Sequence, residues 1–259
     1  MGRPAAAQIR TSMLGAPDYD DPAFWDNKFA TGRDVGEWLN TGEALLDQAL
    51  QDLERRPVHG RPRVLHLGPG ISQLGTKLRD HYLDRQWAPD GIVNVDFSAE
   101  AVRLGQEREH QRNQSQAMHW VRADLRSWDD ISSLTRFAPF DVILDKSTID
   151  SIATSRNYTF SSSDNLHHIC PAIRETLPCH STMTLSPVEL VALQLVSLTQ
   201  KGSTWIALSY STTRFDDLEF LKKYWTIRSR TALRAPTGPV SSSAYTPDIF
   251  HWIYILDRK

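Results

Sequence analysis

The sequence predicts an α/β protein with a doubly wound, mostly parallel seven-stranded sheet and a C-terminal antiparallel hairpin strand. From Arg63 onward, short apolar runs alternate with amphipathic segments, which is the pattern of strand–helix–strand units. Four of these runs in succession are followed by Gly or Asp. The last two runs lack a connecting helix of the usual length, so we expect them to pair as an antiparallel hairpin at one edge.

Length and composition agree with a large globular core. The chain has 259 residues, of which 40% are hydrophobic and 23% charged, values that are ordinary for globular proteins. The formal charge of -2 lacks the basic excess of proteins that mainly bind nucleic acid. Two cysteines are too few for a disulfide framework, and no apolar run reaches the ~18 residues of a membrane span. We therefore expect a cytoplasmic protein without a membrane or nucleic-acid partner.

Residues 1–20 read as a flexible tail rich in Gly, Pro and Ala. Residues 1–17 hold Arg3 and Arg10 and no acid, which is also a feature of mitochondrial transit segments. A mitochondrial location therefore stays open as an alternative. Residues 21–259 are predicted to form a single domain.

The first part of that domain, residues 21–56, is predicted to contain two helices. Pro22 stands at the first turn of one of them, where proline is favoured. Residues 40–43 (NTGE) read as a capping box for the other. Apolar residues then recur at helical spacing, at Leu45, Leu46, Ala49, Leu50 and Leu53.

The remaining elements follow in order along the chain. Strands are expected at 64–67, 92–95, 118–121, 141–144, 204–208, 225–228 and 249–256. Helices are expected at 72–84, from Ser98 to about 111, from the capping box at Ser127, and from Ser186 to the stop signal Lys201–Gly202. Residues 231–248 are left as a long loop between the last two strands. Residues 155–185 have no clean periodicity and are predicted to be an insertion near a substrate site, because long irregular segments are usually functional or mobile.

Four strand ends carry residues suited to binding a cofactor. Gly68 and Gly70 follow the first strand, and Asp96, Asp124 and Asp145 follow the next three. In open parallel sheets, ligands bind at the carboxyl ends of the strands. Glycine lets the backbone approach a ligand closely, a carboxylate at Asp96 can accept hydrogen bonds from a ribose diol, and one at Asp124 from an adenine amine. An adenosine-containing cofactor is therefore expected.

The glycine spacing separates two classes of such cofactor. A dinucleotide fingerprint requires a third glycine three residues after the second, and Gln73 stands there instead. S-adenosylmethionine needs the close turn but no pyrophosphate cradle. We therefore predict S-adenosylmethionine, and a dinucleotide-dependent oxidoreductase is a distant alternative.

Several segments carry a family resemblance. Residues 64–72 (VLHLGPGIS) look like motif I of the class I, seven-β-strand S-adenosylmethionine-dependent methyltransferases, which have a Rossmann-like fold. Residues 140–150 (FDVILDKSTID) resemble the D-K-G-T-L-D segment of a methyltransferase-like subgroup that includes elongation factor 1-alpha lysine methyltransferases. Residues 24–29 (FWDNKF), 36–38 (GEW) and 251–256 (HWIYIL) are similar to further segments of that subgroup.

The resemblance implies a set of cofactor-binding positions. Gly68 and Gly70 would line the methionine part, Asp96 and Phe97 the ribose and adenine, and Asp124 and Leu125 the adenine. Lys146 would lie beside the cofactor, and Trp25, Phe29 and Trp38 would form an N-terminal lid. The chain departs from the pattern at three positions, where Ser147 replaces Gly, Phe29 replaces Tyr and Pro69 replaces Cys.

Methyl transfer assigns a role to one acidic residue. A lysine nucleophile must lose its proton before it attacks, because its ordinary pKa is about 10.4. A carboxylate can orient the amine, and Asp145, with Asp150 or Tyr210 beside it, is the candidate catalytic group. The predicted function is protein-lysine N-methylation, with S-adenosyl-L-homocysteine as product. A small-molecule methyltransferase acting on a thiol, amine or carboxylate is the alternative, as is a non-catalytic cofactor-binding partner protein.

Two other clusters are interpreted as non-functional. His167, His168, Cys170, Cys179 and His180 match no standard zinc spacing, so no metal is expected. A basic cluster near the C-terminus reads as a solvated surface, although it is the remaining route to an acidic partner or RNA. Its members are Lys222, Lys223, Arg228, Arg230 and Arg234.

Overall fold

The structure is a computed structural model that describes residues 18–32, 37–56, 61–112, 116–164, 166–177, 182–236 and 248–259. Most of the predicted tail, residues 1–17, lies outside this part, as do Gly36, Cys179 and His180. No helix in the described part has both the length and the apolar character that a bilayer crossing requires.

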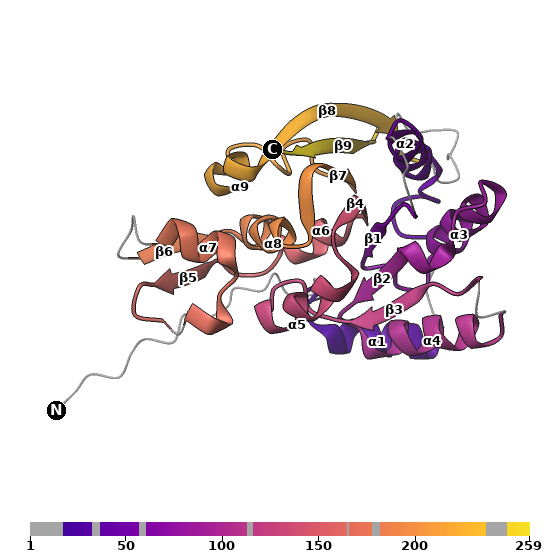
Figure 1. Cartoon of the computed structure of the whole chain (residues 1–259), viewed down its shortest axis with the longest axis horizontal. Helices are drawn as coiled ribbons and strands as arrows, with labels where there is room; N and C mark the ends of the chain where they lie inside the picture. Colours follow the sequence, from indigo (N-terminus) through magenta and orange to yellow (C-terminus); the bar gives the residue numbers. More distant parts are fainter. Residues whose placement is uncertain are drawn as a thin grey trace, which may run out of the picture.

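A seven-stranded sheet forms the centre of the molecule (Figure 1), with strand order β3-β2-β1-β4-β7-β9-β8. The strands are β1 (Val64–Leu67), β2 (Ile92–Asp96), β3 (His119–Arg122), β4 (Phe140–Lys146), β7 (Thr199–Ser209), β8 (Trp225–Arg234) and β9 (Phe250–Arg258). The first five are parallel to one another, whereas β9 runs antiparallel between β7 and β8. The predicted fold class, including the C-terminal antiparallel hairpin, is confirmed.

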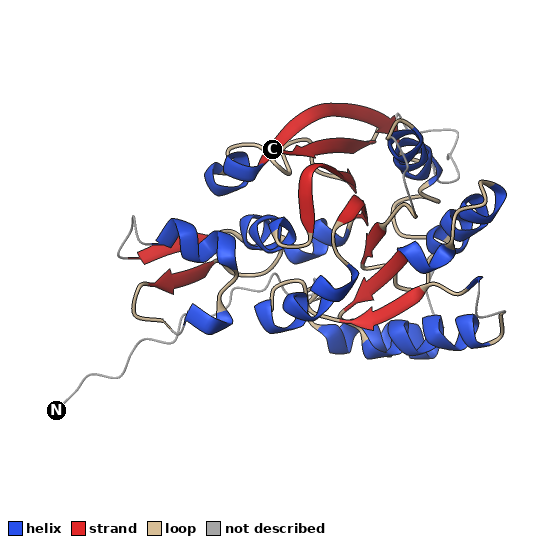
Figure 2. Cartoon of the chain, in the orientation of Figure 1, coloured by secondary structure: helices blue, strands red, loops and turns tan. Residues whose placement is uncertain are grey.

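Helices cover both faces of this sheet (Figure 2). On one face lie α2 (Glu43–Glu54) and α3 (Leu74–Asp84), whose leucines pack on Val64, Val142 and Ile206. On the other lie α5 (Trp128–Ser133), α6 (Thr148–Ile152), α8 (Pro187–Val196) and α9 (Glu219–Tyr224). Two further helices, α1 (Pro22–Thr31) and α4 (Ala99–His110), pack against each other. Burial on both faces explains why the central parallel strands β1, β2 and β4 are mostly apolar.

Three expectations about element boundaries are wrong. The residues at 40–43 form no capping box, because the N-cap of α2 is Gly42 and no side chain bonds there. Instead, the Asn40 side chain accepts a hydrogen bond from the Gly42 N–H. The helix from Ser186 ends earlier than predicted, at Val196, because β7 begins at Thr199, and Lys201–Gly202 lie within that strand. Strand β8 extends to Arg234, so the connection to β9 is shorter than predicted.

Residues 155–185 contain regular structure that periodicity did not reveal. Strands β5 (Tyr158–Ser161) and β6 (Thr182–Leu185) form a two-stranded antiparallel sheet, with α7 (Pro171–Thr176) between them in the chain. This unit shares an apolar core with α8, in which Ile173 and Met183 pack near Leu190. Each strand is only four residues long, so its alternation is too short to stand out in the sequence.

Candidate functional site

One cavity lies at the carboxyl ends of β1, β2 and β4, where the strand order reverses. All ten residues that the sequence singled out for cofactor binding line this cavity. They are Trp25, Phe29, Trp38, Gly68, Gly70, Asp96, Phe97, Asp124, Leu125 and Lys146. Parallel pairing of β1 with β2 and β4 places Leu67 beside Val95 and Asp145, so the loops that follow these strands meet at one edge.

The glycine loop after β1 is shaped by two left-handed residues. Gly68 has φ +51° and Gly70 has φ +52°, a conformation that glycine adopts without strain. A Cβ on Gly68 would overlap the side chain of Thr148, and one on Gly70 would lie 2.9 Å from the Phe29 ring. Both glycines are therefore required for the close approach of α6 and α1 to this loop.

Asp96 at the end of β2 is the buried acid of the site. Its carboxylate accepts hydrogen bonds from the N–H groups of Gly70 and Ser98, both at 2.9 Å. Burial raises the pKa of Asp96 to about 6, and the nearby Asp26 carboxylate adds to this rise. Asp26 in turn accepts a 2.6 Å hydrogen bond from the Ser98 hydroxyl, which ties α1 to the start of α4.

Arg126 joins three parts of the chain beside the cavity. Its guanidinium donates to the Asp124 carboxylate at 2.7 Å, to the Ser155 hydroxyl at 3.0 Å and to the Asp20 carbonyl at 3.2 Å. The hydrogen bond to Asp124 is the main reason that the pKa of Arg126 is raised. Arg126 thus links the loop after β3 to the residues before α1 and to the first residue of the 155–185 segment.

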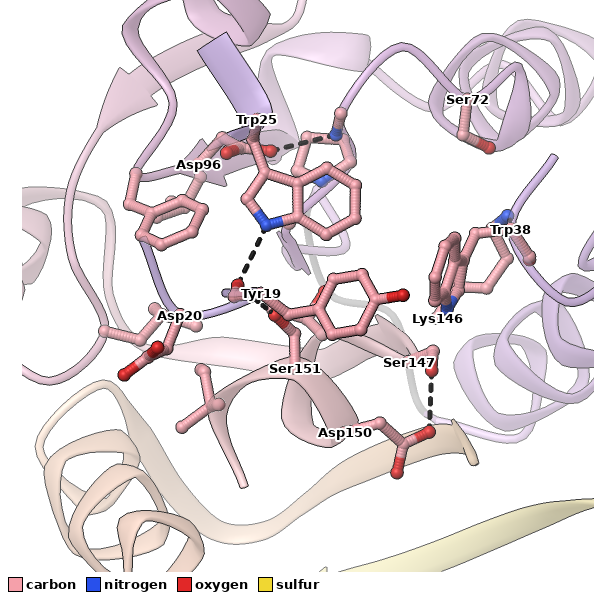
Figure 3. Close-up of a pocket in the computed structure, with 18 of the residues that line it drawn as sticks. Tyr19, Asp20, Trp25, Trp38, Ser72, Asp96, Lys146, Ser147, Asp150 and Ser151 are labelled. Atoms are coloured by element: carbon pink, nitrogen blue, oxygen red, sulfur yellow. Dashed lines mark hydrogen bonds between the residues drawn. The ribbon is translucent and has the colours of Figure 1, made fainter. Parts of the chain in front are cut away.

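An aromatic cluster from the N-terminal segments forms one side of the cavity. It consists of Tyr19, Phe24, Trp25, Phe29 and Trp38, and adjacent rings lie 5.2 to 6.0 Å apart. The Tyr19 carbonyl accepts hydrogen bonds from the Trp25 indole at 2.9 Å and the Ser151 hydroxyl at 2.6 Å (Figure 3). The segment before α1 is therefore bound to α6 across the cavity.

Two lysines line the cavity in different electrostatic settings. The Lys146 ammonium donates to the Glu37 carboxylate and to the carbonyls of Trp38 and Asn40. The Lys28 ammonium lies 5.6 to 5.8 Å from the ring centroids of three members of the aromatic cluster. Within the described part of the chain, no carboxylate forms an ion pair with Lys28.

Asp145, the predicted catalytic residue, is fully buried and does not line the cavity. Its carboxylate accepts hydrogen bonds from the N–H groups of Thr148 and Ile149 and from the Trp205 indole. Burial raises the pKa of Asp145 to about 7, and the Asp150 carboxylate contributes to the rise. Asp145 thus accepts hydrogen bonds from the first N–H groups of α6, outside the cavity lining. Asp150 and Tyr210, the two residues named beside it, do line the cavity.

Several lining residues were not singled out by sequence reasoning, among them Tyr19, Lys28, Ser72, Arg126 and Ser147. Lys28 and Ser147 lie inside the segments that carry the family resemblance, so those segments could have indicated them. Tyr19 and Arg126 act through main-chain and long-range contacts, for which the sequence holds no signal.

The basic cluster near the C-terminus is largely neutralised. Arg228 pairs with Asp52 and Asp257. Lys222 pairs with Asp217, Arg230 with Asp216 and Arg234 with Asp248. Lys223 donates to the Thr176 hydroxyl. In the described part of the chain, no three His, Cys, Asp or Glu residues form a candidate metal site.

Comparisons with known proteins identify the fold. No protein-family model matches the chain, and no curated protein matches its sequence. An S-adenosylmethionine-dependent methyltransferase from Anabaena variabilis has a similar structure, with a TM-score of 0.52 and 9% identity over 93% of this chain and 95% of that one. So does the N-methyltransferase NodS from Bradyrhizobium japonicum in complex with S-adenosyl-L-homocysteine, with a TM-score of 0.50 and 10% identity over 90% of this chain and 96% of that one.

Proposed function

We propose that this chain, which has the Rossmann-like fold of the class I methyltransferases, is an S-adenosylmethionine-dependent methyltransferase. One observation carries the proposal: residues predicted from six separate segments to hold this cofactor line a single cavity at the switch point of the sheet. In open α/β sheets, this point is where ligands bind.

The cavity fits the chemical groups of the cofactor. Gly68 and Gly70 line the cavity with main chain and no side chain, and the Asp96 carboxylate is suited to the ribose hydroxyls. Asp124 is suited to an adenine amine, because a carboxylate oxygen that already accepts from Arg126 still has a second acceptor site. The cofactor also carries a carboxylate. Lys28 is the lining cation suited to it, since Arg126 and Lys146 are already paired with acids.

The residues around the cavity supply alignment and exclusion of water. S-adenosylmethionine, when bound, supplies a methyl group already activated by its sulfonium, so little acid–base chemistry is left for the protein. The aromatic cluster shields one side of the cavity, and Tyr19 closes it toward α6 through its carbonyl. An amine acceptor must be neutral to react, and an apolar surrounding favours the neutral form of an amine.

For the acceptor we propose a protein lysine, with an elongation factor 1-alpha-like protein as the first substrate to test. Two observations support this choice. The segments at 24–29 and 140–150, which resemble those lysine methyltransferases, both contribute to the cavity lining. In addition, Trp38 and Tyr210 are large aromatic residues exposed at the cavity, where an incoming side chain can reach them. The Asp145 and Asp150 carboxylates both accept hydrogen bonds from protein donors. We therefore propose that the aromatic residues, and not these acids, orient the acceptor amine.

Two experiments test the proposal. Calorimetry should show binding of S-adenosyl-L-homocysteine but not NAD, with clear loss of binding in Asp96→Ala. If the wild-type protein does not bind S-adenosyl-L-homocysteine, the proposal is overturned.

A cell lysate with radiolabelled S-adenosylmethionine should yield label in the protein fraction when the chain is added. Label in the organic extract would instead indicate a small-molecule acceptor. Label in neither fraction, despite tight cofactor binding, would indicate a non-catalytic cofactor-binding protein.

A further inference from the structure

The strand order divides the cavity into two ends. The residues suited to the ribose and adenine follow β2 and β3, on one side of β1. Strands β4 and β7 lie on the other side of β1, and residues that follow them, Ser147 and Tyr210, line the same cavity. With the methionine part at the glycine loop after β1, the end at β4 and β7 is left for the methyl acceptor.

A buried ion pair shapes this second end. Asp150 is 3% exposed, and Arg214 donates to its Oδ1 at 2.7 Å. The Ser209 hydroxyl donates to the same oxygen, whereas the Ser147 hydroxyl and the Tyr210 N–H donate to Oδ2 at 2.6 and 3.1 Å. One carboxylate thus joins α6, the residue before it and the end of β7, and its charge is compensated by Arg214.

The backbone conformation of Ser147 supports a role for its hydrogen bond to Asp150. Ser147 has φ +64°, in the left-handed region that favours glycine, and the resembling family segment has glycine there. A non-glycine residue is strained in this region. Its hydroxyl makes the 2.6 Å hydrogen bond to Asp150 that a glycine could not make (Figure 3). The serine therefore adds a contact that holds the carboxylate.

Tyr210 is the residue that this arrangement presents to the cavity. Its side chain is 53% exposed, although its N–H is held by the buried Asp150. The Arg214 guanidinium lies 5.4 Å from the centre of the Tyr210 ring. Asp150 therefore holds both the backbone of Tyr210 and the cation that packs on its ring. Trp38, 39% exposed, is a second aromatic residue at the same cavity.

We propose that Tyr210 contacts the acceptor amine and that Asp150, through Arg214 and the Tyr210 backbone, is the positioning residue for this contact. Aromatic rings attract amines in their cationic form at short range, and a phenol oxygen accepts a hydrogen bond from a neutral amine. The acceptor class is thus a primary or methylated amine. This inference rests on the proposed methyltransferase function.

A pair of cofactor analogues tests the inference without knowledge of the substrate. Sinefungin carries a primary amine in place of the transferable methyl group, whereas S-adenosyl-L-homocysteine has neither. The ratio of their dissociation constants therefore measures recognition of an amine at the acceptor end. Tyr210→Ala should weaken sinefungin binding about threefold to tenfold relative to S-adenosyl-L-homocysteine. Tyr210→Phe, which keeps the ring, should retain most of the ratio.

Asp150→Asn should change the ratio in the same direction as Tyr210→Ala. Asp52→Asn is the matched control, because Asp52 is also a buried carboxylate with arginine partners but does not line the cavity. It should lower stability and leave the ratio unchanged. An unchanged ratio in Tyr210→Ala and Asp150→Asn, with normal S-adenosyl-L-homocysteine binding, overturns the inference. Failure of the wild type to bind either compound overturns the proposed function instead.

Discussion

The ammonium group of Lys146 donates a 2.7 Å hydrogen bond to the carboxylate of Glu37, and this ion pair joins the end of β4 to the segment before α2. Glu37 also accepts from the Ser72 hydroxyl and the Gln73 N–H, next to the glycine loop. Burial works to raise the pKa of Glu37, but the Lys146 ammonium and these donors together lower it. The carbonyl of Trp38 is bound to the same ammonium, so one ion pair sets the position of an aromatic residue at the cavity.

Lys146→Met should loosen residues 37–40 and destabilise the protein. The Lys146 side chain is 5% exposed, and a hydrogen bond to a charged group contributes about 1.5–3 kcal/mol. We expect a loss of roughly 2 kcal/mol in the free energy of unfolding, measured by urea denaturation, and weaker binding of S-adenosyl-L-homocysteine. Lys77→Met is the control, because its ion pair with Glu43 is more exposed and should contribute less than about 1 kcal/mol. Equal losses in the two variants would contradict the assigned role.

Gly68→Ala should abolish cofactor binding. The added Cβ would overlap Thr148, whose hydroxyl donates to the Leu67 carbonyl at 2.8 Å, so the loop or α6 must shift. Gly32→Ala is the matched control, since Gly32 also has a positive φ but no described atom lies within 4 Å of its added Cβ. It should carry only the backbone strain, about 1–2 kcal/mol. Calorimetric titration with S-adenosyl-L-homocysteine separates the two variants, and unimpaired binding by Gly68→Ala would be inconsistent with this geometry.

Cofactor affinity should fall in acid because of Asp96. Its pKa is raised to about 6, mainly by burial, and the ionised carboxylate accepts hydrogen bonds from the ribose hydroxyls more strongly than the protonated carboxyl does. Binding of S-adenosyl-L-homocysteine should therefore be constant above about pH 7 and weaken up to tenfold per unit below pH 6. Asp96→Asn should bind weakly at every pH and lack this dependence. A wild-type affinity that is flat from pH 5 to 8 would exclude the role of Asp96.

Arg126→Met should release the segment before α1. The substitution removes the hydrogen bonds to the Asp20 carbonyl and the Ser155 hydroxyl while keeping an apolar stem of similar length. We expect faster hydrogen exchange at residues 18–21, read by mass spectrometry. Arg103→Met is the control, because Arg103 is exposed and bonds only to acids of its own helix α4 in the described structure. Unchanged exchange in Arg126→Met would contradict this role of Arg126.

Much of the fold was predictable because the central parallel strands β1, β2 and β4 are buried on both faces. Such strands are continuous apolar runs, and each is followed by a polar residue or glycine at the site edge. The predicted helix start at Ser186 is confirmed, and Ser186 and Glu189 form reciprocal hydrogen bonds there. The irregular 155–185 segment was not predictable as a folded unit, because its core forms with α8, which lies outside it.

The sequence by itself determined the order along the chain of the strands of the main sheet, and it indicated the residues that line the cavity after β1, β2 and β3. These follow from local pattern, since strand direction alone brings Gly68, Asp96 and Asp124 to one edge. Only the tertiary structure decided where each acidic side chain lies relative to the cavity and which group it pairs with. Asp145 and Asp150 stand five residues apart in one motif, yet Asp145 lies below the cavity whereas Asp150 lines it and pairs with Arg214. The partners that decide this, Trp205 and Arg214, come from distant segments, so no local pattern could reveal them.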